Sequence, residues 1–125
     1  ISKCAAEFAG TFLLVFTVGC NVLGNPGSDW AGVSIACVLM VSIYTFGGIS
    51  GANFNPAVSI SLGITKAFGG NGMDFTEVVI YCIVQIIAGI AAAVAYSSLL
   101  FTDPQALDAQ PSPGFSMVSA AICEA

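Results

Sequence analysis

The chain has 125 residues, of which 57% are hydrophobic and 7% are charged, and its mean hydropathy is +0.94. Because a soluble domain carries about 25% charged residues, this composition places the chain in a lipid bilayer. A net charge of −5 with two Lys or Arg residues excludes nucleic acid as a partner, since phosphate binding needs clustered cations.

The first predicted element is a spanning helix over about residues 4–23, since a hydrocarbon core needs about 20 apolar residues. Glu7 is the one carboxylate inside it. A charge in lipid costs several kcal/mol, so this position is a candidate functional site. Proton relay and snorkelling to the nearby interface are its possible roles.

Two further spanning helices are predicted over about residues 31–49 and 75–100. Clusters of glycine, proline and polar residues at 24–29, 69–72 and 102–114 mark the turns and loops around the helices. All three clusters are too polar and too rich in helix breakers to span a membrane.

The two cations set the expected orientation. With a cytoplasmic N-terminus, three crossings leave Lys3 and Lys66 inside, while Asp29, Asp103 and Asp108 lie outside. This arrangement agrees with the positive-inside rule.

Residues 47–68 cannot form one continuous spanning helix, because glycines and Pro56 interrupt them. Asn55 has the chemistry of a helix N-cap, and Pro56 suits the first helical position. The helix that follows would be roughly 20 Å long, too short for a ~30 Å core. We therefore expect a re-entrant loop and half-helix over about residues 50–68, shielded from lipid or lining a wet passage.

The five cysteines do not indicate a metal site. They are scattered without CxxC spacing, and the chain has no histidine to complete a mixed site. We expect small buried thiols, no metal, no cofactor and no enzymatic reaction.

Residues 47–59 read GGISGANFNPAVS and resemble the first signature of the aquaporin family, the major intrinsic proteins, whose pattern is GxxSGAxxNPAVT. Ser59 replaces threonine, and Asn53 stands where many members have histidine. The spacing of Glu7, Thr11 and Phe16 is similar to the family's first helix. Gln85, followed by small residues, is similar to its third.

The resemblance implies an all-α membrane protein with an aquaporin-like helical bundle, in which Asn55, Pro56 and Ala57 lie at the pore. The Asn55 amide would donate to a passing water, while the positive end of the half-helix disfavours cations and protons. The loop carbonyls would supply hydrogen-bond acceptors along the path. These carbonyls belong to Gly51, Ala52, Asn53 and Phe54.

The resemblance also implies that Glu7 and Gln85 brace the re-entrant backbone by hydrogen bonds. A count of about twenty positions back from Asn55 puts Ile35 at the family's selectivity filter. An aliphatic residue there is a smaller plug than an aromatic one, although Ile35 could instead face lipid or pack against a neighbour.

We expect residues 1–114 to form the first of two inverted repeats and residues 115–125 to start a fourth spanning helix in a truncated second repeat. The echo of residues 4–9 in residues 120–125 supports this reading. By resemblance, the full-length protein would be a homotetramer with one pore per subunit.

The predicted function is passive passage of water and small neutral solutes such as glycerol through a multi-pass membrane protein. Two alternatives are a non-conducting membrane-assembly or adhesion protein and a proton-coupled transporter that uses Glu7.

Overall fold

The computed structural model describes residues 1–24, 28–100, 116 and 118. Within this part of the chain the structure has four helices and no strand. The helices are α1 (Ser2–Val22), α2 (Ala31–Ser50), α3 (Pro56–Ala67) and α4 (Phe75–Leu100). Apart from residues 116 and 118, the predicted start of a fourth spanning helix at 115–125 lies outside the described residues, as do Asp103 and Asp108.

Three of these helices, α1, α2 and α4, are long and apolar enough to cross a membrane. At 1.5 Å per residue, the 21 residues of α1 and the 20 of α2 each extend about 30 Å, which matches a hydrocarbon core. The 12 residues of α3 extend only about 18 Å. The all-α membrane fold predicted from the sequence is confirmed.

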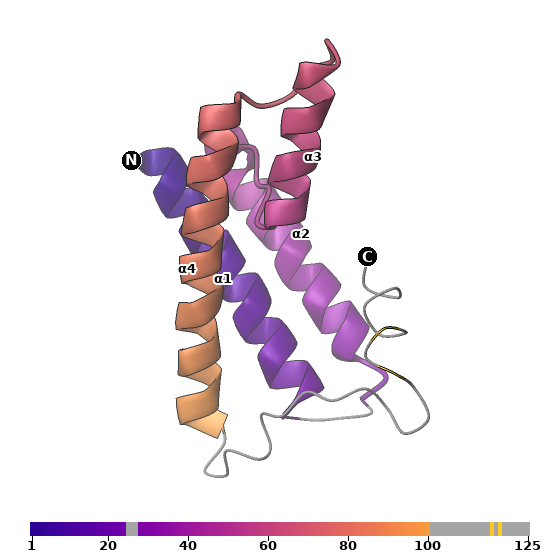
Figure 1. Ribbon diagram of the computed structural model, residues 1–125. Helices are drawn as coiled ribbons and strands as arrows, with labels where there is room; N and C mark the ends of the chain where they lie inside the picture. The colour runs from indigo at the N-terminus through magenta and orange to yellow at the C-terminus, as the bar shows by residue number, and fades with distance from the viewer. Residues whose placement is uncertain (25–27, 101–115, 117, 119–125) are drawn as a thin grey trace.

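The three long helices form one bundle in which α1 lies between α2 and α4 (Figure 1). Along the chain, α1 descends in this view, α2 ascends, and α4 descends again. The short α3 occupies only the upper half of the bundle, where it packs against α4.

Small residues let α1 and α4 approach closely. Ala88 and Ala92 of α4 are fully buried. Gly19 of α1 lies under the ring of Tyr96, whose Cδ1 is 2.3 Å from the place where a Cβ would stand. Near the same end of the bundle, Asn21 donates a hydrogen bond to Ser34 and so joins α1 to α2.

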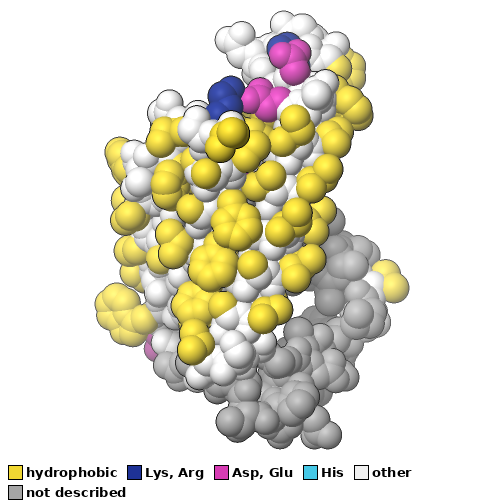
Figure 2. All heavy atoms as spheres, turned by 90° about the vertical axis from the view of Figure 1, so that its left-hand side faces the viewer, with side chains coloured by type: hydrophobic (Ala, Val, Ile, Leu, Met, Phe, Trp, Pro, Cys, Tyr) yellow, Lys and Arg dark blue, Asp and Glu magenta, His cyan; other side chains and the backbone are white. Residues whose placement is uncertain are grey.

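The face of the bundle in Figure 2 is largely apolar, and most of the charged side chains visible on it gather at one end, with one acidic side chain near the other end. There Lys3 pairs with Glu77 and Lys66 pairs with Asp74, each at 2.8 Å. The apolar side chains exposed on α4 include Ile80, Ile83, Ile87, Ile90 and Val94. An apolar belt with charges at its edge is the surface that a bilayer solvates, so the chain is an integral membrane protein.

Candidate functional site

The amino end of α3 lies at mid-depth in the bundle. Phe54, two residues before α3, packs on Gly10, which is 8 residues from the start of α1 and 12 from its end. These spacings correspond to roughly 12 Å and 18 Å along the helix. The reversal is visible in Figure 1, where the chain descends from the end of α2 and α3 climbs back.

Glycine allows α2 to end where it does. Gly51 has φ 91°, and its N–H donates to the Gly47 carbonyl, which closes the last turn. A left-handed residue at this position is a common helix terminator because glycine adopts it without strain. The chain is then free to turn back into the bundle.

Asn55 caps α3 in extended conformation, with φ −152° and ψ 127°. Its Oδ1 accepts a hydrogen bond from the Ala57 N–H at 2.9 Å, and Pro56 occupies the first helical position. Among the described residues, none accepts a hydrogen bond from the Asn55 Nδ2. The exposed side chain therefore presents two free N–H donors at the positive end of the α3 dipole.

Two non-glycine residues of the loop before Asn55 have left-handed backbones, Ala52 with φ 55° and Phe54 with φ 52°. Such conformations cost of order 1–3 kcal/mol each and persist only when surrounding contacts hold them. No described donor reaches the carbonyl oxygens of residues 51–54. Within the described part of the chain these carbonyls are therefore unpaired.

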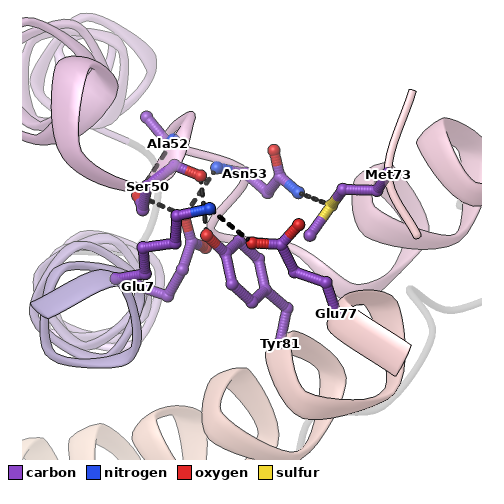
Figure 3. A network of polar contacts seen from close by, with 8 residues as sticks. Glu7, Ser50, Ala52, Asn53, Met73, Glu77 and Tyr81 are labelled. Carbon is purple, nitrogen blue, oxygen red and sulfur yellow. Dashed lines mark hydrogen bonds and ion pairs between the residues drawn. The ribbon is translucent and has the colours of Figure 1, made fainter. Parts of the chain in front are cut away.

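The contacts that hold the loop converge on Glu7, whose side chain is fully buried. Its Oε1 accepts from the Ser50 hydroxyl at 2.6 Å and from the Asn53 N–H at 3.0 Å. Its Oε2 accepts from the Phe54 N–H at 2.8 Å and from Gln85 Nε2 at 2.9 Å. Figure 3 shows the carboxylate of α1 turned toward Ser50 and Asn53. One side chain thus joins α1, the end of α2, the loop and α4.

One alternative for Glu7 and one expectation for Gln85 differ from the structure. Glu7 does not snorkel to the interface, because the end of α2 and the loop cover it. Gln85 does not contact the loop backbone. Its amide donates to Glu7 and, at 3.0 Å, to the Ser59 hydroxyl in the second turn of α3, so it supports the loop indirectly.

Sequence reasoning did not identify two further supports of the loop. The Tyr81 hydroxyl of α4 donates to the Ser50 carbonyl at 2.7 Å and fastens the end of α2. The Phe54 ring, 2% exposed, meets Phe46 edge-on with centroids 6.2 Å apart. A Cβ on Gly10 would lie 2.1 Å from that ring, so this position needs glycine. Phe54, an aromatic residue inside the motif, was the signal in the sequence that could have indicated this packing.

Asn53 is buried behind the loop. Its Nδ2 donates to the Ser59 hydroxyl and to the Met73 sulfur, both at 3.1 Å. Figure 3 shows the amide directed toward Met73, which lies in the segment between α3 and α4. The side chain therefore links the loop to the opposite end of α3.

Ile35 lies near the start of α2, half-buried and two helical turns before the buried Ser42. Residues seven apart share a helix face, so Ile35 is on the same face as Ser42. Among the described residues, no hydrogen bond or ring contact joins it to the cluster around Glu7.

The model of the family described as "Major intrinsic protein" matches residues 1–125. The chain belongs to the major intrinsic protein family. It is 39% identical over 99 residues to "Glycerol uptake facilitator protein-like 6" of Lactiplantibacillus plantarum, an alignment that covers 78% of this chain and 44% of the relative. It is 44% identical over 105 residues to "Aquaporin Z" of Photorhabdus laumondii, covering 77% of the chain and 43% of the relative.

A third relative in the major intrinsic protein family is "Aquaporin AqpM" of Methanothermobacter marburgensis, 32% identical over 155 residues that cover 98% of the chain and 58% of the relative. The chain thus spans about half the length of these curated relatives. No solved structure gave a significant match.

Proposed function

We propose that the full-length protein is a passive membrane channel for water and small neutral solutes such as glycerol, and that it excludes ions and protons. The observation that carries the proposal is the amino end of α3 at mid-depth, with Asn55 Nδ2 free to donate. A short helix that stops inside the bilayer leaves polar groups that need a wet passage.

The passage would work by exchanging hydrogen bonds. A water oxygen approaching α3 accepts from Asn55 Nδ2, and its hydrogens meet the unpaired carbonyls of Gly51 to Phe54. Apolar side chains beside these groups limit how tightly the water is held. The positive end of α3 raises the energy of a cation or an excess proton at the same point, so neutral molecules pass.

Ile35 is the residue of this chain that we assign to the selectivity filter. An aliphatic side chain provides no hydrogen bond and leaves more width than an aromatic ring, which favours solutes larger than water. The names of the relatives, which include both aquaporins and a glycerol uptake facilitator, fit either permeant.

The larger architecture is part of the proposal. Residues 1–114 would form the first repeat and residues 115–125 the start of an inverted second repeat, with a homotetramer as the assembly. The N-terminus would be cytoplasmic, because Lys3 and Lys66 lie at the same end of the bundle.

Two rival functions predict different fluxes. A membrane-assembly or adhesion protein predicts no water flux above that of protein-free vesicles. A proton-coupled transporter needs a carboxylate that exchanges protons, whereas four donors occupy the oxygens of Glu7.

Stopped-flow light scattering on proteoliposomes of the full-length protein tests the function. The channel proposal predicts faster volume change than in protein-free vesicles under osmotic gradients, and a rate unchanged by a pH gradient or a membrane potential. Identical rates with and without protein would refute the channel. Flux that follows the proton gradient would favour the transporter.

A further inference from the structure

The segment between α3 and α4 contacts the re-entrant loop through the sulfur of Met73. Met73 is held in place by its own backbone, whose N–H donates to the Leu62 carbonyl of α3 at 3.2 Å. Its sulfur accepts the hydrogen bond from Asn53 Nδ2 at 3.1 Å. Because Asn53 N–H is itself bound to Glu7, displacement of this sulfur acts on the backbone that carries the loop carbonyls.

Met73 is also open to small reagents. The residue is half-buried, and its neighbours on either side in the chain are exposed. It lines a cavity of about 210 Å³ at the charged end of the bundle, together with Gly63, Lys66, Ala67, Asp74 and Phe75. A peroxide molecule has the size to enter such a cavity.

We propose that Met73 is a site of reversible oxidation by hydrogen peroxide, and that oxidation releases Asn53 and lowers the permeability of the channel. A sulfur lone pair attacks one peroxide oxygen and forms the S–O bond as the O–O bond breaks, and the leaving hydroxide takes the proton from the transferred oxygen to become water. The sulfur loses two electrons and becomes a sulfoxide, while the peroxide is reduced. The effect on flux depends on the proposed function, whereas the oxidation itself does not.

Either geometry of the sulfoxide breaks the bond to Asn53. A thioether is a weak acceptor with two lone pairs, and the Asn53 N–H uses one. An oxygen added on that side does not fit between atoms 3.1 Å apart. An oxygen added on the other side leaves a positively polarised sulfur that accepts poorly. The side-chain amide of Asn53 then keeps only its bond to Ser59.

Met40 supplies a matched control. Its side chain is 51% exposed on α2, and no hydrogen bond to it is found among the described residues. Peroxide can therefore oxidise Met40 without touching the loop. Met73→Leu keeps a similar volume but has neither the acceptor nor the oxidisable sulfur, and Met40→Leu removes only the control site.

The experiment treats the full-length protein in proteoliposomes with hydrogen peroxide and measures three quantities. Mass spectrometry follows oxidation at Met73 and Met40, hydrogen–deuterium exchange follows the amides of residues 50–55, and stopped-flow follows water permeability. We expect Met73 oxidation to speed amide exchange roughly fivefold, the factor expected for loss of one buried hydrogen bond, and to lower permeability. Methionine sulfoxide reductase should restore both, and the Met40→Leu protein should respond as the unmodified protein does.

Three results would overturn the inference: peroxide that oxidises Met40 but not Met73, unchanged exchange at 50–55 with Met73 fully oxidised, or equal peroxide sensitivity in Met73→Leu. If the untreated protein is impermeable, the proposed function fails instead. The oxidation and exchange measurements then still decide whether Met73 controls the loop. Reversal by the reductase needs no substitution, so a folding defect in the variant does not affect it.

Discussion

The carboxylate of Glu7 accepts the backbone N–H of Phe54 at 2.8 Å, across 47 positions of sequence. Phe54 has a left-handed backbone and precedes the cap of α3 by one residue. The bond therefore fixes the segment whose carbonyls are unpaired and the position at which the short helix begins. Four predictions test this bond, the packing of the Phe54 ring, the filter position and the free amide of Asn55.

Replacing Glu7 by glutamine should destabilise the loop. A glutamine side chain keeps one acceptor oxygen, but its NH₂ group faces two donors that are then unpaired. We expect the free energy of unfolding to fall by roughly 2–4 kcal/mol and permeability to fall with it. Thermal unfolding in detergent and stopped-flow on the same preparation measure both quantities.

Glu77→Gln is the matched control for that substitution, because it removes a carboxylate from the exposed ion pair with Lys3. An exposed pair contributes about 0–1 kcal/mol, so stability and flux should stay near those of the unmodified protein. Equal effects of the two substitutions would show that Glu7 has no special part in holding the loop.

The contact between Gly10 and Phe54 predicts a rescue by a second substitution. In Gly10→Ala the new Cβ would lie 2.1 Å from the Phe54 ring, so the loop must shift. We expect a loss of about 1–3 kcal/mol in stability, together with lower permeability. Adding Phe54→Leu makes room, and the double variant should recover part of both losses.

Gly48→Ala tests whether the Gly10 effect is specific. A Cβ on Gly48 meets no atom within 4 Å, and alanine is the better helix former by about 1 kcal/mol. This variant should be as stable as the unmodified protein or more so. If the variant that combines Gly10→Ala with Phe54→Leu is no more stable and no more permeable than Gly10→Ala alone, the packing of Phe54 on Gly10 does not explain the effect.

Ile35→Phe should narrow the filter that we assign to this position. The larger ring is expected to lower glycerol flux by a greater factor than water flux, because glycerol is wider than water and fits a narrowed filter less well. Parallel glycerol and water gradients on one vesicle preparation measure the ratio. Ile43→Phe, at a position 46% exposed on the same helix, is the control. An unchanged ratio in Ile35→Phe would remove Ile35 from the filter.

Much of the fold could be predicted from the sequence. The three spanning helices follow from hydropathy and length, and the re-entrant segment follows from glycines and Pro56 inside an apolar stretch. These properties depend on residues close together in the sequence, so they can be predicted without coordinates. The helix start at Asn55 was predictable for the same reason, since an N-cap followed by proline is a local pattern.

The contacts around the loop could be predicted only in part. The composition predicted that Glu7 needs partners in lipid, but it could not say which donors lie near enough. The ring of Phe54 over Gly10, the Tyr81 hydroxyl on Ser50 and the sulfur of Met73 depend on the relative rotation of helices. That rotation is set by packing between segments distant in sequence, which no short window of residues contains. The roles of Asn55, Ile35 and Gln85 in permeation stay predictions.

Asn55→Ser provides the most direct measurement, because serine caps a helix about as well as asparagine but lacks the amide that reaches into the passage. We expect unfolding stability within about 0.5 kcal/mol of the unmodified protein, and water permeability several-fold lower in stopped-flow. Asn71→Ala, in the exposed turn after α3, should change neither. Our central claim is that the amide at the amino end of α3 donates hydrogen bonds to water that crosses the membrane. Full water permeability in a folded Asn55→Ser protein would contradict that claim.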